Sequence, residues 1–71
     1  MSLKDVDMNL LIVEAIEGYA YRHDLSAKET YSLFRDNNIL CLIRENYEAL
    51  HTQGIEESIF FVEDILRRMG K

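Results

Sequence analysis

Apolar residues recur every three or four positions along most of the chain, which is the spacing of amphipathic helices. Strand-like alternation of apolar and polar residues does not persist beyond a few positions. The chain lacks proline and contains only three glycines, and these are the residues that most often interrupt a helix. The pattern therefore predicts one all-α domain over residues 1–71, with three longer helices, one short helix and no sheet.

Local signals place the helix ends. Ser26 followed by Glu29 is the capping-box pattern that starts a helix, and the run DNN at residues 36–38 tolerates the backbone geometry of a turn. Asn46 is a candidate interruption of the third helix, because it could cap a final turn of sequence YEALH. The predicted helices span residues 5–22, 27–35, 39 onward and 55–69.

Each predicted helix has an apolar stripe that we expect to form the core. The stripe residues are Met8, Ile12, Ala15, Ile16, Tyr19, Ala20, Ala27, Tyr31, Phe34, Ile39, Leu40, Ile43, Tyr47, Leu50, Ile55, Ile59, Val62, Ile65, Leu66 and Met69. On the last helix, two acidic residues each precede an arginine by four positions, which predicts the ion pairs Glu63–Arg67 and Asp64–Arg68.

Some apolar residues fall outside these stripes. They are Leu10, Leu11, Tyr21, Leu42, Phe60 and Phe61. On a small chain they could merge into a patch on the order of several hundred Å², the size that marks an interface, so we treat them as interaction candidates. In the alternative, the first and last helices are buried on nearly all sides and these residues belong to the core.

The charge balance argues against a nucleic-acid partner. The chain carries 13 acidic and 8 basic residues, with a net charge of −5, and so lacks the basic face that displaces counterions from phosphates. The longest apolar run, ILCLI at residues 39–43, is far shorter than the roughly 18 to 20 residues that cross a membrane. A single cysteine and no recognisable signal peptide favour a cytoplasmic protein.

The sequence offers little for metal, cofactor or catalytic chemistry. Cys41, His23 and His51 are the only cysteine and histidines, and they match no zinc spacing, so we expect no metal, no cofactor and no enzymatic activity. The apolar neighbours of Cys41 favour a buried packing role over a reactive thiol.

The segment LHTQG, residues 50–54, supports two hypotheses. In the first it is a joint between helices: His51 bonds terminal carbonyls, Thr52 accepts a bond from an amide that opens the last helix, and Gly54 lets the chain turn. In the second, His51, Thr52 and Gln53 contact a ligand or supply a general base beside a hydroxyl. The joint is favoured because no second catalytic group lies nearby in the sequence.

A chain of this length buries only about 60% of the surface that its unfolded form exposes, so its stability margin is thin. Without disulfides or metal, self-association or a permanent partner is the remaining support. We therefore expect a homodimer or a complex with another protein.

Short motifs through most of the chain resemble a family of short bacterial helical proteins known only as a domain of unknown function. The motifs are Tyr19-Ala20, His23-Asp24, Ser26 with Glu29, residues 39–43, Tyr47, His51-Thr52 and Asp64-Ile65. Genes of that family often neighbour predicted ADP-ribosyltransferase-like toxin genes, and it brings no catalytic residues. The resemblance implies a small interaction module, the antitoxin-like or accessory member of an operon pair. The alternative is a small-molecule-binding or enzymatic domain centred on His51, Thr52 and Gln53.

Overall fold

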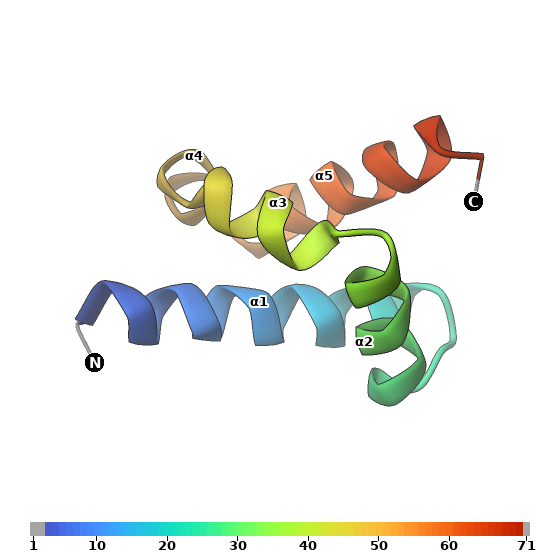
Figure 1. Cartoon of the computed structure of the whole chain (residues 1–71). Coiled ribbons are helices and arrows are strands. Elements are labelled where there is room, and N and C mark those ends of the chain that lie inside the picture. The colour runs from blue at the N-terminus through green and yellow to red at the C-terminus, as the bar shows by residue number, and fades with distance from the viewer. Residues whose placement is uncertain (1–2, 71) are drawn as a thin grey trace.

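The computed structural model describes residues 3–70, with side chains from residue 6 onward. This part of the chain forms α-helices and no strand, which confirms the all-α class (Figure 1). The helices are α1 (Leu3–Arg22), α2 (Ala27–Asp36), α3 (Ile39–Glu45), α4 (Tyr47–Gln53) and α5 (Ile55–Arg68).

The described residues form five helices, so the expected number of four is wrong. The segment from residue 39 divides at Asn46, whose φ of −107° and ψ of 17° leave the helical region. The side-chain amide of Asn46 donates to the Leu42 carbonyl at 2.8 Å, which satisfies an acceptor at the end of α3. The candidate interruption in the sequence is therefore a true helix boundary.

The helices pack around a shared core. α1 runs along one side, α3, α4 and α5 lie across from it, and α2 packs near its C-terminal end (Figure 1). Gly18 allows α1 and α5 to approach closely, because a Cβ atom at this position would collide with the side chain of Ile59.

A tight turn joins α1 to α2. Asp24 has a φ of 54°, and the Leu25 amide donates back to the Ala20 carbonyl at 2.8 Å, which is the bond of a Schellman-type helix end. The Ser26 hydroxyl then accepts from the Glu29 amide at 3.0 Å, as the capping-box pattern predicts.

The predicted stripes supply most of the core. The buried cluster contains Leu11, Ile12, Ala15, Ile16, Tyr19, Phe34, Ile39, Ile43, Tyr47, Leu50, Val62 and Leu66. Phe34, Ile39, Ile43 and Val62 have no exposed surface. These residues come from all five helices, so the core depends on every element.

Several stripe residues do not enter the core. Ala27, Tyr31 and Met69 are exposed, and Thr30 takes the inward position on α2. The Arg35 guanidinium lies over one face of the exposed Tyr31 ring, 5.8 Å from its centroid.

Cys41 is exposed, so the expectation that it packs inside is wrong. The α3 helix buries Ile39 and Ile43, which lie about 40° apart around its axis, whereas Cys41 lies roughly 200° from Ile39 and faces outward.

Within the described residues, no helix combines the length and the apolar character that crossing a membrane requires.

Candidate functional site

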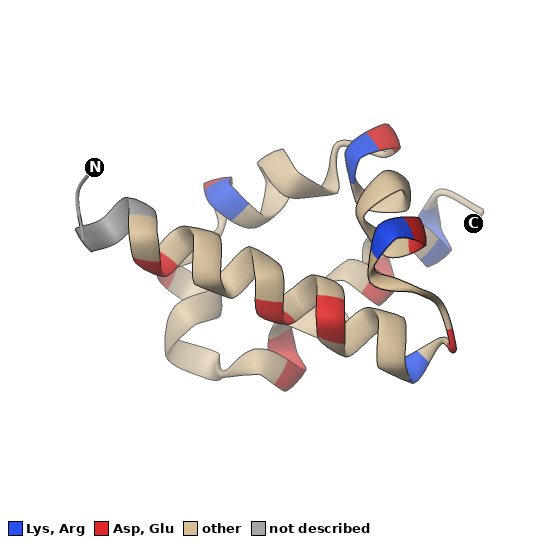
Figure 2. Cartoon of the chain, turned by 90° about the horizontal axis from the view of Figure 1, so that it is seen from below, with Lys and Arg blue, Asp and Glu red and all other residues tan. Residues whose placement is uncertain are grey.

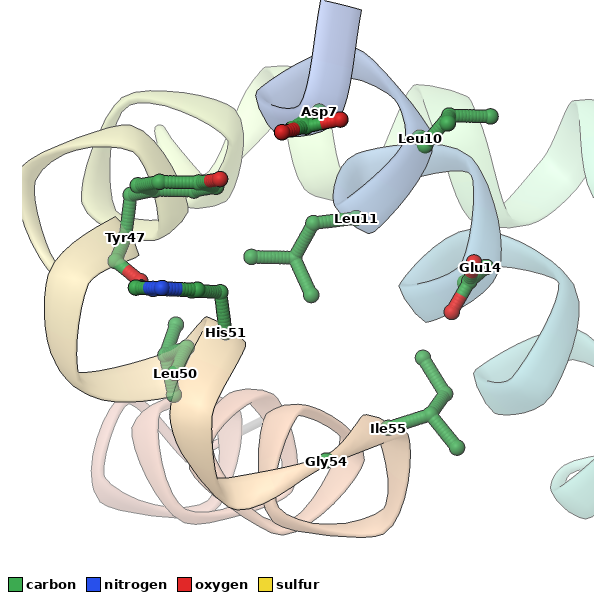
Figure 3. A pocket seen from close by; sticks show the side chains of 9 residues that line it. All are labelled: Asp7, Leu10, Leu11, Glu14, Tyr47, Leu50, His51, Gly54 and Ile55. Atoms are coloured by element: carbon green, nitrogen blue, oxygen red, sulfur yellow. The ribbon is translucent and has the colours of Figure 1, made fainter. Parts of the chain in front are cut away.

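A hollow lies between α1 and the junction of α4 with α5 (Figure 3). Its volume is about 280 Å³. The residues that line it are Asp7, Leu10, Leu11, Glu14, Tyr47, Leu50, His51, Gly54 and Ile55. It therefore joins residues that are far apart in the sequence.

Two carboxylates border the hollow on the α1 side. Asp7 and Glu14 are seven residues apart, so they share one face of the helix, with Cα atoms roughly 10 Å apart along its axis. Both are exposed, and neither has an ion pair or hydrogen bond within residues 6–70. Among the described residues that line the hollow, the charged side chains are these two carboxylates, and none is a lysine or arginine.

The opposite wall is aromatic. The rings of Tyr47 and His51 lie parallel, with centroids 4.6 Å apart and planes 6° apart (Figure 3). The Nδ1–H group of His51 donates to the Tyr47 carbonyl at 2.9 Å, which fixes the imidazole against its own helix. The side chain of Leu11 projects between this wall and α1 (Figure 3).

The segment His51-Thr52-Gln53 has the features of a helix joint. Gly54 has a φ of 93° and a ψ of 171°, a conformation that is essentially restricted to glycine, and His51 bonds a carbonyl as expected. The expected role of Thr52 is wrong, because its hydroxyl donates to the Ala49 carbonyl at 2.9 Å. Of the three polar side chains only His51 lines the hollow; Thr52 and Gln53 do not join it.

A second polar cluster connects the end of α1 to α5. The Glu63 carboxylate accepts from His23 Nε2 at 2.6 Å and from Arg22 Nε at 2.8 Å. Glu63 therefore bonds Arg22 of α1 and His23 of the following turn. The predicted ion pair between Glu63 and Arg67 is wrong. Arg67 instead bonds Asp64 at 2.7 Å, while the predicted Asp64–Arg68 pair forms at 3.0 Å.

Tyr19 lies beside this cluster. Its ring stacks on His23 with centroids 4.0 Å apart. Burial, and secondarily the charge of Glu63, raises the pKa of the Tyr19 hydroxyl above its ordinary value. The repeated spacing Tyr-x-x-x-His, at Tyr19 and again at Tyr47, is a sequence signal for both stacked pairs that the apolar pattern alone does not register.

The interaction candidates divide into exposed and packed residues. Leu10 is 53% exposed and Tyr21 is 92% exposed, but Leu11 is only 8% exposed and belongs to the core, so its expected exposure is wrong. Leu42 and Phe61 are partly buried against the core.

Phe60 is exposed, as expected for an interaction candidate, and it lies beside a charged group of α1. The guanidinium of Arg22 lies 5.1 Å from the centroid of its ring, so Phe60 borders the second polar cluster.

Three exposed apolar residues follow one another on successive turns of α1: Val6, Leu10 and Val13, which we call the α1 outer stripe. Acidic positions recur along the α1 ribbon, and from residue 6 onward its one basic residue is Arg22, at the C-terminal end (Figure 2).

Comparisons with curated proteins and with solved structures found no match to the chain. A family model does match it, over residues 11–68, and carries the description "Protein of unknown function (DUF3791)". The matched segment includes both Tyr-x-x-x-His pairs and most of the core. Since the match covers most of the chain, the protein belongs to this family.

Proposed function

We propose that the protein is a small interaction module that binds another protein through α1, as the antitoxin-like or accessory member of a bacterial operon pair. The observation that carries this proposal is the α1 outer stripe, which borders the hollow at Leu10. Scattered exposed apolar residues are ordinary on protein surfaces. A row on successive turns, continuous with a hollow, is typical of a contact surface.

The charge of the chain supports a basic partner. The net charge is −5, and Asp7 and Glu14, which have no ion pair within residues 6–70, lie beside Leu10 at the hollow. Complementary charge raises the association rate and selects against acidic partners. An acidic module that covers a basic cleft on a neighbouring gene product fits this distribution.

The alternative, a small-molecule-binding or enzymatic domain centred on His51, Thr52 and Gln53, has weaker support. Nδ1 of His51 and the hydroxyl of Thr52 are both bonded to carbonyls of α4. A base and a hydroxyl that work together must lie within hydrogen-bond reach of a shared substrate. These two groups are bonded to different carbonyls of their own helix.

Site-specific photo-crosslinking in the native organism tests the interaction. A photoreactive amino acid at Leu10 should give one dominant adduct with a neighbouring gene product, identified by mass spectrometry. The same probe at Met69, which is exposed and directly follows the C-terminal end of α5, is the matched control and should give no such adduct. Leu10→Glu in a chain probed at Val13 should abolish the adduct. Equal adducts from Leu10 and Met69, or none from Leu10, would contradict the proposal.

A further inference from the structure

We propose that the hollow between α1 and the α4–α5 junction binds the guanidinium group of an arginine side chain presented by the partner protein. This inference rests on the proposed function, and it names the chemistry that the partner must supply. It concerns the hollow itself, whereas the interaction proposal rests on the outer stripe.

Charge selects a cation for this hollow. The carboxylates of Asp7 and Glu14 border it without a partner among the described residues, and no described lysine or arginine lines it. A phosphate or carboxylate ligand would meet two like charges and is disfavoured. Among the described residues, no group of three or more His, Cys, Asp and Glu side chains could hold a metal ion, so an organic cation fits better than a metal.

The size of the hollow and the residues that line it favour a side chain with an apolar stem. The volume of about 280 Å³ lies just below the roughly 300 to 1,000 Å³ that small-molecule sites occupy. Leu11, Leu50 and Ile55 supply apolar surface that can cover methylene groups. One long side chain therefore suits the hollow better than a larger ligand.

The aromatic wall favours arginine over lysine. A guanidinium is planar, stacks on aromatic rings and carries five donors in a fork, so it can bond separate carboxylates. An ammonium is compact and strongly hydrated, and it loses more when it leaves water for a half-apolar site. The exposed ring at this wall is that of His51, which its hydrogen bond to the Tyr47 carbonyl and its stacking on the buried Tyr47 ring hold in place.

Titration of the ¹⁵N-labelled protein with Nα-acetyl-arginine amide tests the site by NMR. We expect saturable shifts in the amide signals of Asp7, Leu11, Glu14 and His51, with a Kd on the order of millimolar, as suits a single side chain. Nα-acetyl-citrulline amide has nearly the same shape without the charge, and it should shift these signals at least tenfold less at equal concentration. Nα-acetyl-lysine amide should bind more weakly than the arginine compound.

Two variants provide matched controls. Asp7→Asn combined with Glu14→Gln should weaken arginine-amide binding by about tenfold or more, because it removes both charges from the hollow. Glu17→Gln changes an exposed acid of the same helix outside the hollow and should alter binding less than about twofold. All three positions are exposed, and circular dichroism will verify that the variants keep their helices.

Several results would overturn the inference. They are shifts spread evenly over all exposed carboxylates, equal binding of the citrulline or lysine compound, or unchanged binding in the double variant. If the arginine compound binds nowhere while the Leu10 probe still captures a partner, the site is wrong and the interaction module stands. If the compound binds the hollow but no partner is captured, the site stands and the interaction module is wrong.

Discussion

At the scale of single residues, the two Tyr-x-x-x-His pairs differ in what the histidine bonds. His51 donates to a carbonyl of its own helix, whereas His23 donates to Glu63, 40 residues away in the sequence. The same local spacing therefore stabilises a helix end in one case and joins two elements in the other. Which outcome occurs depends on whether another helix lies within reach of the imidazole.

Replacing His51 by alanine should lower the free energy of unfolding by about 1 to 2 kcal/mol. The substitution removes a hydrogen bond to the Tyr47 carbonyl and a stacked ring. Helical content should stay the same. Urea denaturation followed by circular dichroism measures both quantities, with the exposed Gln53→Ala as the matched control. Unchanged stability combined with loss of a binding activity would show that His51 acts as a ligand contact.

The raised pKa of the Tyr19 hydroxyl predicts that the protein loses stability at alkaline pH. Because the folded state raises the pKa of its hydroxyl above the ordinary 10.0, the unfolded state loses the proton first as pH rises. The contribution of the neutral hydroxyl is complete below pH 10 and is lost as pH rises through the higher pKa of the folded state. Tyr19→Phe should therefore lose less stability than the wild type between pH 8 and pH 11. Urea denaturation at each pH gives the free energy of unfolding. An equal fall in that free energy for both proteins over this range would contradict the prediction.

At the scale of elements, the contact between α1 and α5 depends on small and large residues that fit together. Gly18 leaves room for Ile59, so the helices approach closely there. Further along α5, Glu63 bonds Arg22 and His23, and Phe60 lies beside the Arg22 guanidinium. An apolar contact and a polar cluster therefore fix this helix pair at neighbouring points.

Substitutions at two adjacent positions of α5 should separate core from surface. Ile59→Ala should cost about 2 to 5 kcal/mol of unfolding free energy, because Ile59 is buried against α1. Phe60 is 42% exposed and Ile59 only 9%, so Phe60→Ala should cost less, because more of the Phe60 side chain already lies in water. Chemical denaturation at several protein concentrations measures the free energy of unfolding of both variants.

A loss for Phe60→Ala as large as that for Ile59→Ala, and independent of concentration, would place Phe60 in the core. A loss that appears only at low concentration would place Phe60 in an interface between chains.

At the scale of the whole molecule, the core is small, and the α1 outer stripe leaves further apolar surface exposed. The radius of gyration is 11.4 Å. The core cluster contains residues of every helix, so the loss of any helix would remove part of the core. Burial of the α1 outer stripe against a second chain would add apolar contact that the monomer lacks.

We expect the isolated protein to have a solution mass above that of the 8.4 kDa monomer at micromolar concentration. The net charge of −5 opposes association of identical chains, so added salt should strengthen it by screening. Sedimentation equilibrium at low and high salt measures both effects. Leu10→Glu should shift the equilibrium to monomer, and the exposed Met69→Glu should not. Monomer alone under all conditions would contradict self-association and leave a different protein as the partner.

The sequence by itself determined the helical class and the inner face of most helices. Phe34, Ile39, Ile43 and Val62 are fully buried where the periodicity places them. The reason is local: 3.6 residues per turn fix which side chains share a face, whatever the neighbouring helices are.

Tertiary structure decided how wide each buried face is and which polar groups meet. Leu11 lies off the predicted stripe but is buried, because the fold brings it into the same core cluster as Tyr47 and Leu50 of α4. Glu63 bonds Arg22 and His23 because α5 crosses the end of α1. The hollow joins Asp7 and Glu14 to His51 only once α4 and α5 are in place. These contacts depend on the relative positions of helices, which periodicity within one helix does not specify.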